Sequence, residues 1–399
     1  MTNTYLLYLL ILLLFIGKTL CSQPIKLIKY NVESKKIDTI SILNNFDNNN
    51  TYNSTLFSKG QNDLSTAILD EQFPTENLSG DNNFTNKFKA DSLYQNSDFP
   101  IRTTVRLNYL ENDTIFPLCS GNIVSPKYVL TAKHCIKPFN NGSNFFNKSD
   151  YFISPVYNNS EENPHFNNTR IKNIYVPFIN GREPDIALLE LNEPLGLITG
   201  WIGIGYEEDN TKLENKTFYK FSYPGMSNFL GNGLSYNADT LYSSFGQLNY
   251  FTDSKIGIKR HKKGIPGESG SSLFSVQNNE EYISYGVFSL AANYEHTRIT
   301  RSIYQAFTHL LSNKYDEPKP LELSIYPNPA TKTIYLFNIL KSDLLEYKIY
   351  NIRGSLLQSS KIYNALDGIS CEALPEGIYI ISCLLKSGNK QLKFIKIKD

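Results

Sequence analysis

The chain has 399 residues, which at about 150 residues per domain predicts two or three folded units. Hydrophobic residues make up 41% of the sequence and aromatic residues 13%, so disorder along the whole chain is excluded. The 39 Lys and Arg residues balance the 38 Asp and Glu residues, leaving a net charge of +1. A protein that binds nucleic acid needs a surplus of basic residues to neutralise the phosphate backbone, so nucleic acid is not expected as a partner.

An apolar run from Tyr5 to Ile16 stands close to the amino terminus. It is too short to span a bilayer but has the length of a signal-peptide core, so residues 1–22 are expected to be a signal peptide. A lipid modification of Cys21 is the alternative, and the bulky Leu20 before it disfavours that modification. No later apolar run is long enough to span a membrane, so no stable span is expected after signal-peptide removal.

Residues 23–99 are rich in Asn, Ser, Asp and Thr, as in the stretch from Asn44 to Asn50. Their scattered apolar residues show little sustained period. We therefore expect residues 23–99 to form a leader or propeptide and not part of a core.

The next region, residues 100–315, contains short apolar runs separated by Gly, Pro and Asn, which predicts mostly antiparallel β structure. The runs are Val105 to Leu107, Gly121 to Val124, Tyr128 to Thr131, Ile174 to Val176, Ile186 to Leu191 and Tyr285 to Leu290. Behind Ser302, a possible N-cap, the spacing of Ile303, Phe307, Leu310 and Leu311 predicts a closing helix. A stiff linker over residues 316–320 and a small β-sandwich over residues 321–399 follow.

The five cysteines fit an oxidising compartment. With Cys21 at the signal boundary, four cysteines remain and allow three pairings. Their clustering favours Cys119 with Cys135 and Cys371 with Cys383, and isolated buried thiols are the alternative.

A histidine follows two strand-like runs that are joined by a Ser-Pro turn. A disulfide between Cys119 and Cys135 would tie the strand before His134 to its neighbour and fix the position of the imidazole. Such bracing suits a general base. A lone histidine is more often structural, so His134 needs partners.

Two other segments offer those partners. In Gly267-Glu268-Ser269-Gly270 a tight turn would present the Ser269 hydroxyl, and the amides of Gly267 and Ser269 would converge on a developing oxyanion. Asp185 opens an apolar strand and would accept a hydrogen bond from His134, which fixes the tautomer of the imidazole. Taken singly, each segment is more often an ordinary turn. The serine lacks the strand-to-helix pattern of an α/β-hydrolase elbow.

Together these segments resemble the chymotrypsin/trypsin superfamily of serine proteases. The family's TAAHC, DIALL and GDSGG motifs correspond, in the same order, to Thr131 to Cys135, Asp185 to Leu189 and Gly267 to Ser271. Gly200-Trp201-Ile202-Gly203 and Tyr223-Pro224-Gly225 are most similar to the bacterial glutamyl-endopeptidase (V8-like) branch. The resemblance implies an all-β fold for residues 100–315, with two six-stranded β-barrels and a closing helix.

The resemblance also assigns roles to residues. It implies a triad of His134, Asp185 and Ser269 in the cleft between the barrels, and a Ser289 hydroxyl that bonds the aspartate and lines the substrate cleft. Phe288 stands where acid-specific members have a histidine, so a preference for cleavage after Glu is not carried over. Glu268 stands where trypsin-like members have the acid that pairs with a freed N-terminal amine. No Ile-Val-Gly-Gly start precedes Cys119, so activation through that salt bridge is not expected.

Lys263 lies six positions before Ser269, where trypsin-like members place the residue at the base of the specificity pocket. An ammonium there would attract an acidic substrate side chain. An ordinary solvated loop lysine is the alternative.

The end of the chain is similar to the C-terminal sorting domain of the Bacteroidetes type IX secretion system. The segments that carry the similarity are Leu323 to Ala330, Tyr350 to Gly354, Leu374 to Tyr379 and Lys393 to Lys396. The resemblance implies that residues 321–399 are a folded address that the secretion machinery reads, and that the protein crosses the inner and outer membranes to be released or held on the cell surface. An ordinary β-sandwich binding accessory is the alternative.

We therefore expect a secreted serine endopeptidase that acts on protein or peptide substrates through an acyl-enzyme. A non-catalytic pseudoprotease that binds at the cell surface is the alternative. His165, His296 and His309 lack ligand-like spacing, so no metal or other cofactor is expected.

Overall fold

The fold is described from a computed structural model and is mostly β. The residues described are 25–42, 58–60, 66–69, 84–112, 114–136, 150–161, 166, 168–225, 236–259, 264–277, 281–290, 294–311, 323–326, 328–337, 344–361, 368–385 and 388–398. The expected signal peptide, the linker at 316–320 and Lys263 lie outside these residues. No helix in this part of the chain is long and apolar enough to cross a bilayer.

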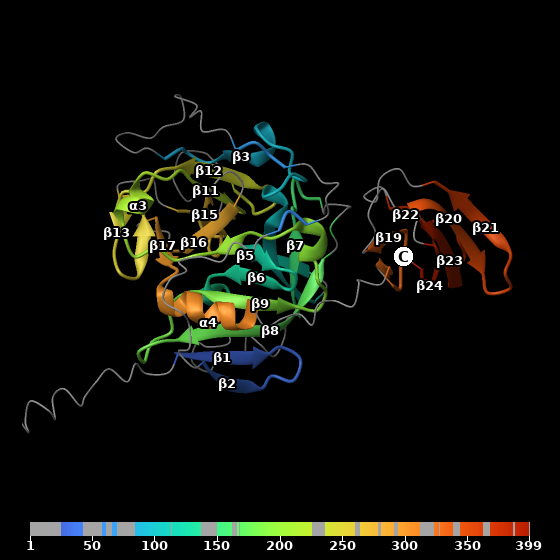
Figure 1. Cartoon of the computed structure of the whole chain (residues 1–399), viewed down its shortest axis with the longest axis horizontal. Helices are drawn as coiled ribbons and strands as arrows, with labels where there is room; N and C mark the ends of the chain where they lie inside the picture. The colour runs from blue at the N-terminus through green and yellow to red at the C-terminus, as the bar shows by residue number, and fades with distance from the viewer. Residues whose placement is uncertain are drawn as a thin grey trace, which may run out of the picture.

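The first unit is a closed six-stranded barrel (Figure 1). Its strands follow one another as β8-β7-β4-β5-β6-β9, and a further pairing of β9 with β8 closes the ring. The strands are β4 (Thr104–Glu111), β5 (Thr114–Ser125), β6 (Tyr128–Thr131), β7 (Asp150–Pro155), β8 (Thr169–Phe178) and β9 (Ala187–Leu191).

The second unit is a half barrel. Its sheet runs β13-β14-β17-β16-β15-β11-β12-β3, with β10 parallel to β16, and no pairing among the described residues joins its two edges. The strands are β3 (Phe88–Lys89), β10 (Gly203–Ile204), β11 (Phe218–Ser222), β12 (Tyr242–Gly246), β13 (Tyr250–Phe251), β14 (Lys255–Gly257), β15 (Ser272–Gln277), β16 (Glu281–Leu290) and β17 (Glu295–Arg298). The expected all-β double-barrel class is confirmed, with one barrel closed by hydrogen bonds.

Short helices complete this part of the chain. They are η3 (Ala90–Ser92), η4 (Ile101–Thr103), η5 (Lys133–Cys135), α2 (Gly196–Thr199), α3 (Thr211–Glu214) and α4 (Arg301–Leu311). The predicted closing helix is α4, which packs against β1 and β8 and buries Ile303, Phe307 and Leu310. Its first turn is capped by the Thr300 hydroxyl, which accepts a hydrogen bond from the Ile303 amide at 3.4 Å, so Ser302 lies inside the helix and is not the N-cap.

The segment expected to lack core residues contributes to both units. β1 (Ile25–Asn31) pairs with β2 (Ile37–Ile42) and adds to β8, while β3 adds to β12. The side chains of Leu27, Phe84 and Phe99 are fully buried. The buried apolar residues of this segment stand singly or in short stretches within a polar sequence. The overall composition of residues 23–99 therefore did not reveal that the segment contributes to the core.

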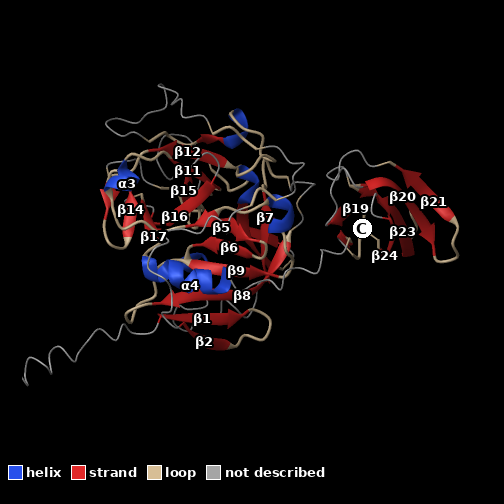
Figure 2. Cartoon of the chain, viewed as in Figure 1, coloured by secondary structure: helices blue, strands red, loops and turns tan. Residues whose placement is uncertain are grey.

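The C-terminal unit has two small sheets with their own core (Figure 2). The strands are β18 (Ser324–Tyr326), β19 (Thr333–Phe337), β20 (Leu344–Asn351), β21 (Leu356–Ser360), β22 (Ile369–Ser370), β23 (Gly377–Leu385) and β24 (Gly388–Lys396). One sheet runs β18-β19-β22 and the other β21-β20-β23-β24, in agreement with the expected small β domain.

The cysteines of this unit correct the favoured pairing. Cys371 and Cys383 are buried free thiols and do not form a disulfide. Burial raises the pKa of Cys383 to about 12, because the core disfavours the thiolate. Both thiols therefore act as small apolar core residues, which is the alternative considered from the sequence.

Candidate active site

The backbone around His134 is held by the first barrel. β6 ends at Thr131, and His134 follows in the single turn η5. The predicted disulfide joins Cys135 to Cys119 on β5, the strand that pairs with β6. The disulfide and the strand pairing therefore brace the imidazole from both sides.

His134 and Asp185 are in direct contact, although 51 positions separate them. Asp185 precedes β9, which pairs with β6, so the antiparallel register brings the aspartate beside η5. The His134 Nδ1–H donates to Asp185 Oδ2 at 2.7 Å, and the His134 backbone amide donates to Oδ1 at 2.8 Å. Both carboxylate oxygens thus fix the histidine, one through its ring and one through its backbone.

Asp185 is held as a carboxylate. Burial disfavours its charged form, but the hydrogen bonds and charge of His134, together with Lys255, outweigh that effect and lower the pKa of Asp185 below 3.8. The group therefore stays an acceptor at neutral pH and keeps the proton of the imidazole on Nδ1, which leaves Nε2 as the basic nitrogen.

The loop before β15 requires glycine at two positions. Gly267 and Gly270 have φ values of +92° and +87°. A Cβ would lie 2.3 Å from the Tyr223 carbonyl oxygen at Gly267 and 2.1 Å from that of Ser120 at Gly270. The tight turn predicted around Ser269 therefore requires glycine at positions 267 and 270, because any side chain there would clash with the backbone.

Ser269 lies between these glycines and is half-buried. Its carbonyl oxygen accepts a hydrogen bond from the Ser120 amide at 2.8 Å, so the loop is fastened to β5 beside Cys119. Within the described part of the chain, no hydrogen bond joins Ser269 to His134, and none uses the amides of Gly267 or Ser269. The structure thus brings His134 and Asp185 into contact, and it fastens the loop that carries Ser269 to β5, the strand next to β6.

Ser289 lies on β16 and contacts a residue that the sequence analysis did not identify. The Lys255 ammonium donates to Ser289 Oγ at 2.8 Å and to Thr297 Oγ1 at 3.1 Å. Burial lowers the pKa of Lys255, and the charges of Asp185 and Glu295 partly offset that effect. No motif surrounds Lys255, because only the pairing of β14 with β17 and of β17 with β16 brings it to Ser289.

The disulfide bears on metal binding. Cys119, His134 and Cys135 lie close enough together to resemble a metal-ligand group. The two cysteines are joined to each other and offer no thiolate, so these residues do not fit a metal.

A closed barrel and a half barrel that carry an imidazole–carboxylate pair and a glycine-bracketed serine are the architecture of the double-barrel serine-protease class. Residues 94–312, more than half of the chain, match the family described as "Trypsin". The chain belongs to the trypsin family.

Individual relatives are distant. A glutamyl endopeptidase of Bacillus licheniformis is 24% identical over 203 residues, which are 48% of this chain and 58% of the relative. Coagulation factor IX of Oryctolagus cuniculus is 38% identical over 93 residues, which are 22% of this chain and 31% of the relative. The chain thus spans less than two thirds of the length of either relative.

A thermostable serine protease, AL20, from an extremophilic microorganism is a structural neighbour. It is 16% identical, and the match covers 53% of this chain and 98% of that chain with a TM-score of 0.40.

The end of the chain matches a second family. Residues 324–398 match the family described as "Secretion system C-terminal sorting domain". This agrees with the expected sorting domain and indicates a secreted or cell-surface protein.

Proposed function

We propose that this protein is a serine endopeptidase with Ser269 as nucleophile, His134 as general base and acid, and Asp185 as the group that orients the histidine. The observation that carries the proposal is the double hydrogen bond of Asp185 to His134, next to a loop that only glycines can form around Ser269. The pair sets the tautomer that the reaction needs.

The steps follow from these groups. Ser269 Oγ forms a bond to the peptide carbonyl carbon while His134 Nε2 takes the hydroxyl proton, and the Gly267 and Ser269 amides stabilise the oxyanion. His134 then gives the proton to the leaving amine as the C–N bond breaks. Water, activated by the same imidazole, hydrolyses the acyl-enzyme and restores Ser269.

Labelling by a fluorophosphonate tests the nucleophile, because only an activated serine reacts. Wild-type protein is expected to label and hydrolyse peptides, while Ser269→Ala loses labelling and loses several orders of magnitude in kcat. Ser254→Ala removes an exposed hydroxyl and serves as the control. Full peptidase activity in purified Ser269→Ala would contradict the assignment. A folded wild-type protein that does not label would favour the non-catalytic binding protein.

For the substrate we propose a preference for cleavage after acidic residues. A half-buried ammonium, Lys255, bonds Ser289, which is expected to line the cleft, and one relative bears the name glutamyl endopeptidase. Lys263 lies outside the described residues, so its place in the specificity pocket stays a prediction.

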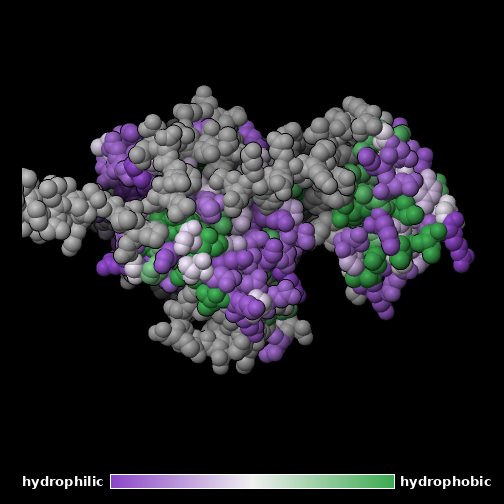
Figure 3. All heavy atoms as spheres, turned by 60° about the horizontal axis from the view of Figure 1, so that its bottom comes forward, coloured by the Kyte–Doolittle hydropathy of each residue, from purple (hydrophilic) through white to green (hydrophobic). Residues whose placement is uncertain are grey.

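We also propose that the C-terminal unit directs export through the type IX machinery and across both membranes. Exposed apolar side chains gather on it, as the green surface of this unit in Figure 3 shows. They are Ile352, Leu356, Leu357, Ile378, Leu384, Ile395 and Ile397. Such a surface suits recognition by a protein partner.

A further inference from the structure

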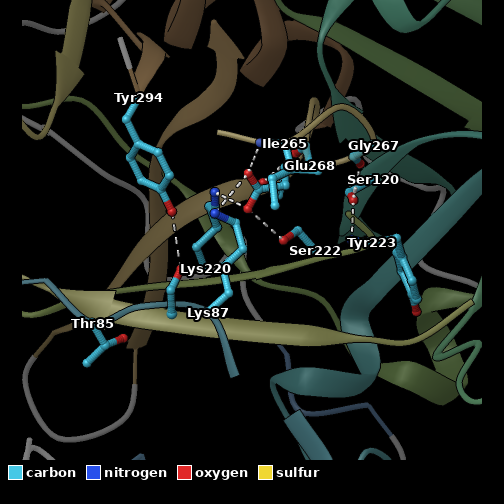
Figure 4. A network of polar contacts seen from close by, with 12 residues as sticks. Thr85, Lys87, Ser120, Lys220, Ser222, Tyr223, Ile265, Gly267, Glu268 and Tyr294 are labelled. Atoms are coloured by element: carbon cyan, nitrogen blue, oxygen red, sulfur yellow. Dashed lines mark hydrogen bonds and ion pairs between the residues drawn. The ribbon is translucent and has the colours of Figure 1, made fainter. Parts of the chain in front are cut away.

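A buried carboxylate precedes the proposed nucleophile directly. Glu268 is fully buried, and it faces two lysines from different parts of the chain (Figure 4). Lys220 Nζ lies 3.0 Å from Glu268 Oε1, and Lys87 Nζ lies 3.4 Å from Oε2. A buried carboxylate needs such partners, because the core does not solvate its charge.

Glu268 also shapes the backbone of the loop. Its Oε2 accepts a hydrogen bond from the Ile265 amide at 2.6 Å, and its own amide donates to the Ile265 carbonyl at 3.1 Å. Its carbonyl oxygen accepts the Ser271 hydroxyl at 2.7 Å. These bonds fix residues 265–271, so the position of the carboxylate determines where the Gly267 and Ser269 amides point.

The two ammonium groups share an aromatic enclosure. Lys220 Nζ lies 4.0 Å from the centre of the Phe288 ring and 4.3 Å from that of Tyr294, and Lys87 Nζ lies 5.3 Å from the Tyr294 ring. Ring faces stabilise cations, so the enclosure holds both charges next to Glu268. Phe288 also bonds the loop directly, since its carbonyl oxygen accepts the Gly270 amide at 2.9 Å.

The lysines differ in origin. Lys220 belongs to β11 inside the half barrel, whereas Lys87 comes from the N-terminal segment just before β3. That segment is fastened on both sides of Lys87. The Thr85 amide donates to the Phe245 carbonyl at 2.8 Å, and the Ala90 amide donates to the Leu241 carbonyl at 2.9 Å.

We propose that Lys87 is a positioning residue for the oxyanion amides, and that residues 84–92 therefore remain part of the active protein. The inference rests on the proposed function. Lys87 and Lys220 together neutralise Glu268 and hold the loop, so no freed amino terminus is needed to organise it. The N-terminal segment supports the proposed site and does not block it.

Kinetics of Lys87→Met test this role. We expect kcat and the rate of fluorophosphonate labelling to fall about ten- to a hundredfold, with little change in KM. This fall is no larger than the effect on kcat of removing one hydrogen-bond donor from an oxyanion hole. Lys87→Arg keeps the charge and should recover most of the rate. Lys89→Met is the control, because Lys89 is exposed and lies two residues further along the same segment.

The outcomes separate the two proposals. Equal kcat for folded Lys87→Met and wild type, or no recovery in Lys87→Arg, would overturn the role of Lys87. A wild-type protein that does not label would overturn the proposed function itself. If Lys87→Met does not fold, sequencing the amino terminus of the active secreted protein decides: a start before Phe84 supports the inference, and a start after Ser92 overturns it.

Discussion

The proposed active site depends on the charge state of a few individual residues. Asp185 is kept ionised by His134 and Lys255, and Lys255 in turn bonds Ser289. One ammonium thus lies close to both the proposed triad and the proposed substrate pocket. Its charge is the feature that would separate acidic from neutral substrates.

Lys255→Met should therefore change specificity. A lost charge-assisted hydrogen bond is worth about 1.5–3 kcal/mol, so kcat/KM for cleavage after acidic residues should fall about ten- to a hundredfold. Cleavage after neutral residues should change much less. A peptide-library digest measures both, with Lys259→Met as the exposed control. Equal losses for both substrate classes would show that Lys255 acts only through the fold or Asp185.

At the scale of the element, the loop from Ile265 to Ser271 behaves as one unit. Two glycines permit its shape, and one buried carboxylate fixes it. Burial disfavours ionisation of Glu268, but Lys220, Lys87 and the Ile265 amide outweigh it and lower the pKa of Glu268 below 4.5. The loop is therefore coupled to pH.

Because the folded pKa is the lower one, Glu268 stabilises the protein above its unfolded pKa of about 4.5, and this contribution is lost as the pH falls through the folded pKa. The free energy of unfolding should fall less steeply in Glu268→Gln than in wild type between about pH 5 and pH 3, by up to about 1.4 kcal/mol per pH unit. Urea unfolding at a series of pH values measures the slopes. Glu193→Gln, an exposed carboxylate, is the control, and identical slopes for wild type and Glu268→Gln would contradict the prediction.

At the scale of the whole molecule, the C-terminal unit is distinguished by its own hydrophobic core and by apolar residues that remain exposed on its surface. Ile378 and Ile395 are paired across β23 and β24, yet these residues are 40% and 38% exposed. Exposed apolar pairs contribute little to stability but much to a contact with a partner. This surface is where we expect the export machinery to bind.

Replacing both isoleucines by serine should lower the fraction of protein found outside the cell severalfold, with the thermal unfolding temperature nearly unchanged. Immunoblots of cells and medium measure the distribution. Leu93→Ser alters an exposed leucine of the N-terminal segment and should leave export unchanged. Normal export of the double variant would remove this surface from recognition.

The sequence predicted those features that depend on local patterns. Short apolar runs between Gly, Pro and Asn predicted the barrel strands, and motif order predicted His134 and Asp185, whose contact follows from the pairing of β6 with β9. Features that depend on distant pairing were missed. Lys255 contacts Ser289 and Lys87 contacts Glu268, and both partners lie far along the chain. No local pattern predicts that Cys383 is a free thiol.

The N-terminal strands have a consequence for the time course of folding. β1 and β3 are made first, but their partners β8 and β12 come much later in the chain, and Lys87, which faces Glu268, lies just before β3. Such long-range pairings form slowly, and neither strand can pair with its partner until that partner has been made. On the export route proposed above, slow closure would keep the chain extended enough to pass through a translocation pore and would delay assembly of the proposed active site.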